Sequence, residues 1–205
     1  MARQQRALRT RQALITAAAT VFDRDGFSVA SLTAISSLAQ VSNGALHFHF
    51  ANKAALADAV EQAAAQRLQA IVTAHEGSAG NCLQLLVDTS HDLARRLAAD
   101  VVLRAGFELG RNRVRGAGQA LHRQWHAWVA AALERAAGEG VLGEVAPETV
   151  TSSVVAATTG FEVLGTRDPQ WLSHATLTRF WQLLLPRLAA APALTSLTAA
   201  GTRPH

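Results

Sequence analysis

The chain has 205 residues, of which 49% are hydrophobic and 17% charged, and its formal net charge is +4. This length allows one large or two small domains with a proper core, and the sequence has no charge-free apolar run of about 18 residues that would predict a membrane span. The single cysteine, Cys82, excludes an intrachain disulfide and is typical of a reducing cytoplasm, where we expect the protein to be located.

The excess positive charge is concentrated at the N-terminal end. Residues 1–53 contain six basic side chains against two acidic ones, whereas the other 152 residues contain thirteen of each. A polyanionic partner is indicated for the N-terminal end, because neutralising phosphates releases their counterions. A generally basic solvated surface, the alternative, would spread the excess evenly.

The first predicted element is a helix over residues 6–24 that ends at Gly26, a residue typical of helix C-termini. Two short helices follow, one over 32–39 with Ser31 as its N-cap and one through Phe48 capped by Ser42 or Asn43. Such a pair is a helix-turn-helix, whose second helix enters the major groove of DNA. Three residues are expected to cover the apolar side of the first short helix, namely Leu46, Phe48 and Phe50.

Short helix pairs also occur in many other all-α domains, and the residue types here favour DNA binding. The second short helix has small or polar residues where its backbone must approach DNA closely, and hydrogen-bonding side chains flank it. The predicted DNA-binding residues are Thr33, Ser42, Asn43, Gly44, His47 and Lys53.

The rest of the chain is also predicted to be helical, since no segment has the alternating pattern of a strand. The further helices are expected over residues 53–75, 81–99, 101–111, 117–138, 147–165 and 169–190. The predicted fold is therefore all-α, with about nine helices. We divide it into a DNA-binding domain at 1–53, a ligand-binding and dimerisation domain at 54–190, and a disordered tail at 191–205.

Most of the aromatic residues lie in the second domain, which has no catalytic signature. They can line a pocket for a flat or lipophilic small molecule, although each single ring can equally be ordinary core. The predicted ligand-binding residues are Leu103, Phe107, Trp125, Trp128, Phe161 and Trp181. The 147–165 and 169–190 helices carry more apolar or small-residue surface than one copy needs, which predicts a two-fold dimer rather than a monomer.

Enzymatic function is not expected. The chain has no Gly-x-Ser-x-Gly, phosphate-loop or His-Glu-x-x-His motif. His47 and His49 are two residues apart on a helix and point in different directions, so no metal site is predicted, and no cofactor is expected.

The stretch from Leu14 to Lys53 strongly resembles the TetR-type transcriptional repressors, above all in the run Gly44-Ala45-Leu46-His47-Phe48-His49-Phe50-x-x-Lys53. More narrowly, this run, Val102-Leu103-Arg104-Ala105-Gly106 and the isolated Trp125 resemble the γ-butyrolactone-receptor and pseudo-receptor branch. The resemblance implies a homodimer, one or more per operator, that leaves DNA when a small signal binds. It also implies DNA contacts at Thr33, Asn43, His47 and Lys53, and a pocket at Trp125.

We therefore predict a repressor of secondary metabolism that binds a palindromic operator and is released by a small hydrophobic molecule, either a γ-butyrolactone or an antibiotic or its intermediate. The alternative from another class is a helical module that binds a small molecule without regulating genes. The sequence does not specify the ligand, the operator or the target genes.

Two residues depart from the branch. Asn43 stands where lysine is usual, and because asparagine favours adenine whereas lysine favours guanine, the preferred base can differ there. His47 stands where tyrosine is usual, and histidine changes charge between about pH 5 and 8.

We predict that operator affinity rises as the pH falls from about 8 to 6, because a charged imidazole at position 47 is attracted to phosphate. Operator titrations at several pH values test this prediction. A His47→Tyr variant with the same pH dependence would remove the hypothesis.

Overall fold

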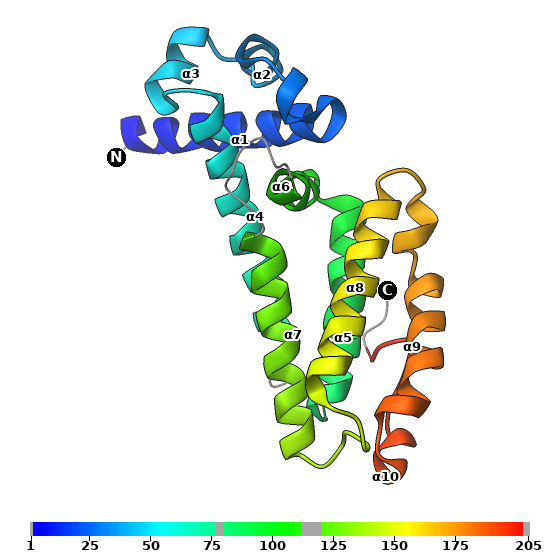
Figure 1. Cartoon of the computed structure of the whole chain (residues 1–205). Helices are drawn as coiled ribbons and strands as arrows, with labels where there is room; N and C mark the ends of the chain where they lie inside the picture. The colour runs from blue at the N-terminus through cyan, green and yellow to red at the C-terminus, as the bar shows by residue number, and fades with distance from the viewer. Residues whose placement is uncertain (1, 77–79, 112–119, 203–205) are drawn as a thin grey trace. The chain divides into compact units, whose positions relative to one another are not determined.

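The computed structural model describes residues 2–76, 80–111 and 120–202 (Figure 1). Within these ranges there is no strand, apart from one isolated pairing of Leu142 with Ala189. The elements are α1 (Ala2–Val29), α2 (Leu32–Leu38), α3 (Asn43–His49), α4 (Lys53–His75), α5 (Cys82–Ala99), α6 (Val101–Arg111), α7 (Ala120–Gly138), α8 (Pro147–Gly165), the 3-10 helix η2 (Pro169–Leu172), α9 (His174–Leu188) and α10 (Ala191–Leu194). The predicted all-α fold is confirmed, and the expected start of the 117–138 helix lies outside the described residues.

The chain forms two compact units. Unit 1 comprises residues 1–67 and 100–121, and unit 2 comprises residues 68–99 and 122–205. α4 therefore passes from unit 1 into unit 2 after Arg67, and α6 belongs to unit 1. The predicted boundary after Lys53 separates a DNA-binding function from a ligand-binding one, and it stays a prediction. The boundaries of the compact units lie at other residues.

Unit 1 is built around α1, which packs against α2 and α6. α1 is interrupted at Gly26, whose φ of +77° lies in the region that glycine adopts without strain, as the sequence predicts for a helix end. Arg104 of α6 holds Asp23 of α1 through two hydrogen bonds of 3.1 and 2.9 Å. The fully buried side chains of this unit include Leu14, Ala18, Phe22, Ile35, Leu46, Leu56 and Val60.

Gly106 marks a close approach of α6 to α4 within unit 1. A Cβ at Gly106 would lie 2.2 Å from the Cβ of Ala64, so the helices would have to move apart. We predict that Gly106→Ala lowers the free energy of unfolding by about 1–3 kcal/mol, measured by denaturant titration. Gly138→Ala is the control, because a Cβ there meets nothing within 4 Å. Equal stabilities of the two variants would contradict the prediction.

Unit 2 is organised around α5, which contacts α8, η2 and α9 (Figure 1). Every side chain from Leu83 to Ala94 is buried, including six polar or charged ones. Trp181 of α9 is fully buried and donates a 2.7 Å hydrogen bond from Nε1 to Oγ of Ser90 on α5.

The C-terminal segment differs from the disordered tail that we expected at 191–205. Residues 191–194 form α10, and Thr198 and Thr202 make hydrogen bonds to α5. The physical reason is that α5 carries buried polar side chains that need partners, a requirement that the small residues of the tail do not reveal locally. Residues 203–205 lie outside the described part of the chain.

Candidate functional site

The helix pair α2 and α3 begins in the way that the serine caps predict. Oγ of Ser31 accepts a 3.1 Å hydrogen bond from the backbone N–H of Ala34, and Oγ of Ser42 accepts one of 3.1 Å from that of Ala45. Gln40, in the link, has a φ of +56° and turns the chain sharply between the two helices. These local contacts give the pair the form of a helix-turn-helix (Figure 1).

α3 has a buried side and an exposed side. Leu46 is fully buried, whereas five of the predicted DNA-binding residues are exposed, namely Thr33, Ser42, Asn43, Gly44 and His47. A Cβ at Gly44 would have only the Oγ of Ser42 within 4 Å, at 3.9 Å. The exposed side of α3 is therefore polar and open at its N-terminal turn.

The prediction that Phe48 covers the apolar side of α2 is wrong. Its side chain is 83% exposed, and its ring meets that of His49 edge-on at 5.2 Å. The reason is the helical period, because Leu46 and Phe50 are four residues apart and share the buried side, while position 48 turns away from it. Phe48 thus joins the exposed side of α3, next to His47.

Asn43 is held by the first helix of the pair. Its Oδ1 accepts a 2.6 Å hydrogen bond from Oγ of Ser36, which is buried in α2. A bidentate contact to adenine also needs this oxygen as an acceptor. Asn43 can therefore recognise adenine only if Oδ1 accepts a second hydrogen bond or loses the one from Ser36. Its two N–H groups can donate to an acceptor on DNA.

Lys53 has a structural role that the sequence does not reveal. Its Nζ donates hydrogen bonds of 3.1 Å to the carbonyl of Ser28 and 2.9 Å to that of Ala30, and it lies 4.8 Å from the ring centroid of Phe27. The ammonium group has three N–H donors, so one remains for a phosphate. Contact of Lys53 with DNA stays a prediction.

We predict that Lys53→Met destabilises unit 1 by about 1.5–3 kcal/mol even without DNA, because two carbonyls lose a charged donor. Thermal unfolding measures the effect. Arg24→Met is the matched control, since the Arg24 side chain is 65% exposed and pairs with its neighbour Asp25, so its loss should leave the unfolding temperature nearly unchanged. A stable Lys53→Met variant with lost operator affinity would instead assign Lys53 to DNA alone.

The six predicted ligand-binding residues are distributed over both units. Leu103 and Phe107 are buried in α6 of unit 1. The other four lie in unit 2, where they form two clusters of rings. Trp125 and Trp128 stack on α7, and Phe180 joins the other two by edge-on contacts of 5.4 Å with Phe161 and 5.1 Å with Trp181.

The α7 cluster combines flat apolar rings with buried polar groups. Trp125 is 2% exposed, stacks on Trp128 at 5.2 Å, and donates a 2.8 Å hydrogen bond from Nε1 to Oγ1 of Thr158 on α8. One helical turn before Trp125 on α7, Nε2 of His122 lies 3.5 Å from Oε2 of the buried Glu162 on α8. The indole N–H of Trp128 is buried and has no hydrogen-bond partner among the described residues. Such a group can orient a bound polar atom.

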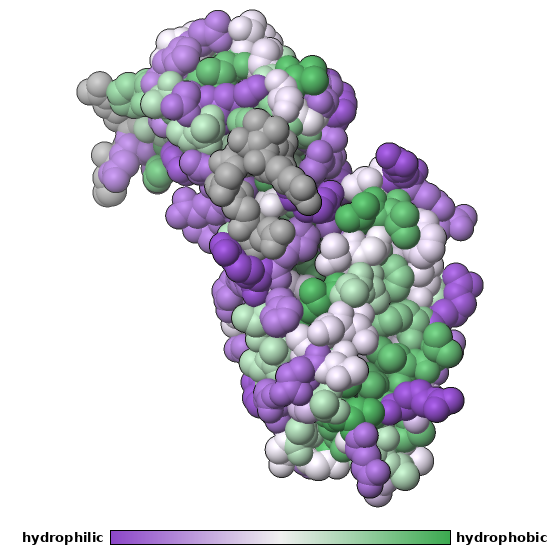
Figure 2. Space-filling view, in the orientation of Figure 1, coloured by the Kyte–Doolittle hydropathy of each residue, from purple (hydrophilic) through white to green (hydrophobic). Residues whose placement is uncertain are grey.

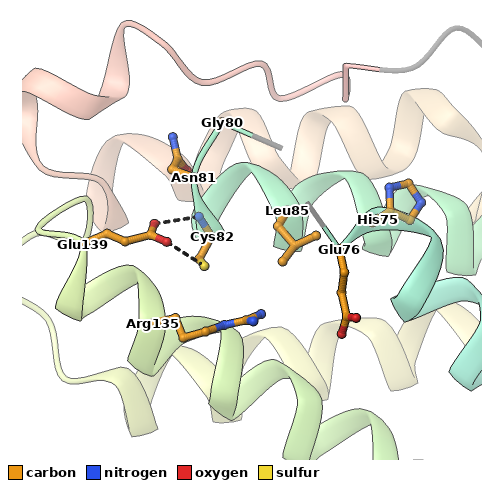
Figure 3. A pocket seen from close by; sticks show the side chains of 8 residues that line it. All are labelled: His75, Glu76, Gly80, Asn81, Cys82, Leu85, Arg135 and Glu139. Carbon is orange, nitrogen blue, oxygen red and sulfur yellow. Dashed lines mark hydrogen bonds between the residues drawn. The ribbon is translucent and has the colours of Figure 1, made fainter. Parts of the chain in front are cut away.

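A separate pocket of about 430 Å³ lies in unit 2 and contains none of the predicted ligand-binding residues (Figure 3). Its lining residues are His75, Glu76, Gly80, Asn81, Cys82, Leu85, Arg135 and Glu139. Sγ of Cys82 donates to Glu139 at 2.9 Å, and burial together with this bond raises the pKa of the thiol to about 11. The thiol therefore stays protonated at neutral pH and is a poor nucleophile.

Comparison with known proteins identifies the family. Residues 14–60, which include the helix-turn-helix, match the sequence profile of the bacterial regulatory proteins of the tetR family. The chain is also 31% identical over 195 residues to the A-factor receptor protein of Streptomyces griseus, covering 92% of this chain and 67% of that protein. The chain belongs to the TetR family.

Solved structures of the TetR family agree with this assignment over nearly the whole chain. A crystal structure of a gamma-butyrolactone receptor (ArpA like protein) has a TM-score of 0.80 and 26% identity, covering 95% of this chain and 96% of that one. CprB from Streptomyces coelicolor, in complex with its biological operator sequence, has a TM-score of 0.77 and 27% identity, covering 93% and 94%. The resemblance to the γ-butyrolactone-receptor branch is therefore confirmed.

Two further observations concern membrane spans and metal sites. No described helix of this TetR-family chain is long and apolar enough to cross a membrane. In the part of the chain that the structure describes, no three metal-ligating side chains lie together.

Proposed function

We propose that the chain is a dimeric repressor that binds a palindromic operator through α3 and leaves it when a small hydrophobic molecule binds in unit 2. The observation that carries the proposal is the exposed polar side of α3, presented by a capped helix-turn-helix in a chain of the TetR family. We propose no catalytic activity.

Basic side chains of α1 support the DNA-binding part of this proposal. Arg6, Arg9 and Arg11 are exposed, and the guanidinium of Arg11 lies 5.3 Å from the ring centroid of Phe50, which follows α3 directly. Cations beside α3 can neutralise phosphates on either side of the groove that the helix enters. Thr33, Asn43, Gly44, His47 and one donor of Lys53 would supply the remaining contacts.

An exposed apolar face supports dimerisation through α8 and α9. Figure 2 shows apolar and small residues gathered over these helices. On α8 the stripe of small residues predicted from the sequence is exposed at Ser153 and Ala156 and continues to Val163, which is 40% exposed. On α9, Leu177 is buried within the protomer, whereas Leu183 is 78% exposed. We propose that these faces meet their copies across a two-fold axis.

The stacked indoles of unit 2 support a hydrophobic ligand. Trp125 and Trp128 offer flat surfaces, and the indole N–H of Trp128 and the polar groups of Thr158 and Glu162 can bind oxygen or hydroxyl groups. A molecule like a γ-butyrolactone, or an antibiotic or its intermediate, combines apolar surface with the oxygen atoms that such groups bind. We keep both classes open.

Ligand binding can release DNA only if the ligand prefers a conformation that binds the operator poorly. Two recognition helices must lie about one DNA turn apart, ~34–36 Å, to fit a palindrome. α4 belongs to unit 1 at its N-terminal end and to unit 2 at its C-terminal end, so we propose that it transmits the change.

A mobility-shift assay with a random palindromic DNA pool at two salt concentrations tests the proposed function. We expect selected duplexes to bind with an affinity that falls steeply as salt increases, because several phosphates are contacted. Absence of binding at low salt, together with binding of a lipophilic compound, would favour the helical ligand-binding module instead.

A further inference from the structure

The C-terminal residues 198–202, here called the strap, lie across α5 and α9 of unit 2. The strap meets a stripe of polar side chains on α5, spaced four and three residues apart so that they share one side of the helix. These side chains are Gln84, Asp88 and His91, which are 3%, 6% and 6% exposed. Buried polar groups need partners, and the strap supplies them.

Gln84 binds both main-chain polar groups of Thr198, the first residue of the strap. Its Nε2 donates to the carbonyl of Thr198 at 3.2 Å, and its Oε1 accepts from the N–H of the same residue at 2.8 Å. On the strap these contacts involve main-chain atoms alone, so they recognise its backbone rather than a particular side chain. The same carbonyl of Thr198 accepts a 2.9 Å hydrogen bond from the N–H of Gly201, which closes a turn within the strap.

Asp88 binds the last residue of the strap. Its carboxylate accepts from the N–H of Thr202 at 2.9 Å and from Oγ1 of Thr202 at 2.5 Å, and Gln84 donates to the same carboxylate at 2.8 Å. Gly201 allows the approach, since its φ is +80° and a Cβ there would lie 3.3 Å from Oδ1 of Asp88. This end of the site selects a hydroxyl-bearing residue after a glycine.

The middle of the strap joins the two helices. Nε2 of His91, on α5, lies 2.9 Å from the carbonyl of Ala199, and Nε2 of His174, on α9, lies 2.8 Å from the carbonyl of Ala200. A carbonyl can only accept, so each imidazole donates from Nε2. The two rings lie 4.8 Å apart, and consecutive peptide groups of the strap thus connect α5 to α9.

We propose that this face of α5 and α9 is a peptide-binding site that the chain fills with its own strap. The site takes a five-residue segment that forms a turn, with small residues in the middle and a serine or threonine at the fifth position. The docked strap adds hydrogen bonds between α5 and α9 to the direct packing of these helices, and release of the strap leaves the polar side chains of α5 without these partners. The residues that bind the strap are distinct from those of the helix-turn-helix and from Trp125 and Trp128.

The first test separates the site from its occupant. A chain that ends at Leu194 is titrated with a synthetic peptide of residues 195–205, and binding is followed by calorimetry and by the unfolding temperature. We expect saturable one-to-one binding that raises the unfolding temperature of the shortened chain. A peptide with Thr202→Val loses the hydroxyl bond to Asp88 and should bind about tenfold more weakly or worse. Equal binding of both peptides, or no binding to the folded shortened chain, would overturn the proposal.

A second test uses the full chain and applies even if the shortened chain does not fold. Gly201→Ala should undock the strap, because alanine is strained at this φ and its Cβ meets Asp88. We expect the amide hydrogens of Thr198 and Thr202 to exchange about tenfold faster than in the original chain. Ser196→Ala is the control, since its hydroxyl donates within its own turn to Ala193. Unchanged exchange in Gly201→Ala would contradict a docked strap.

Discussion

Replacing Gly44 with glutamate is expected to lower operator affinity by about 100-fold or more while leaving the fold intact. Gly44 is exposed on α3, and a Cβ there meets only the Oγ of Ser42, at 3.9 Å, so the added side chain has room in the free protein. In the complex it would push the backbone of α3 away from the groove and bring a negative charge toward phosphates. The effect should therefore appear in binding and not in unfolding.

Mobility shifts with the selected operator and thermal unfolding of the free protein measure the two quantities. Gly44→Ala separates bulk from charge, and we expect it to lose less affinity than the glutamate variant. Gly138→Glu adds the same charge in α7, at a position where a Cβ has free space, and should bind the operator normally. If Gly44→Glu bound the operator as tightly as the original chain, α3 would not be the recognition helix.

The local parts of the helix-turn-helix could be predicted from the sequence because their causes are local. Ser31 and Ser42 accept hydrogen bonds from the first turns of their own helices, and Gly26 interrupts α1 within a few residues of the predicted end. The resemblance to the TetR-type repressors came from the same stretch, Leu14 to Lys53.

The parts that the sequence did not reveal depend on contacts between distant residues. Lys53 binds carbonyls about 25 residues away in the sequence, and Asp88 binds Thr202, which is 114 residues away. A lysine beside a predicted DNA-binding helix predicts a phosphate contact, and a tail of small residues predicts disorder. Both predictions change once the residues that these segments contact are known. Phe48 is a different case, since the helical period placed it away from Leu46, and the aromatic run alone suggested a core.

The predicted ligand-binding residues also depend on contacts between distant residues, which the sequence does not reveal. Trp125 and Trp128 are three residues apart on α7, so their contact followed from the period. Thr158 and Glu162 were not identified, because nothing in the sequence of α8 tells which of its polar residues face α7. The pairings 125–158 and 122–162 run in opposite directions along the two helices, which makes α7 and α8 antiparallel neighbours.

The Trp125 site is expected to give the largest stability effect, because Trp125→Ala removes a buried indole and should lower the free energy of unfolding of unit 2 by about 3–5 kcal/mol. Such a loss does not by itself show ligand binding. Trp125→Phe and Thr158→Val are more specific tests. The first keeps an aromatic ring, and the second leaves the indole N–H without its 2.8 Å acceptor, which should cost about 1–3 kcal/mol of stability.

The double variant should cost less than the sum of the two single variants, because the hydrogen bond can be lost only once. Denaturant titration of the four proteins measures this coupling. For function, we expect Trp125→Phe to need a higher concentration of any lactone or polyketide-type antibiotic that releases the original chain from its operator. If Trp125→Phe responded to that compound as the original chain does, while showing the expected loss of stability, Trp125 would be part of the core of unit 2 and the ligand would have to bind elsewhere.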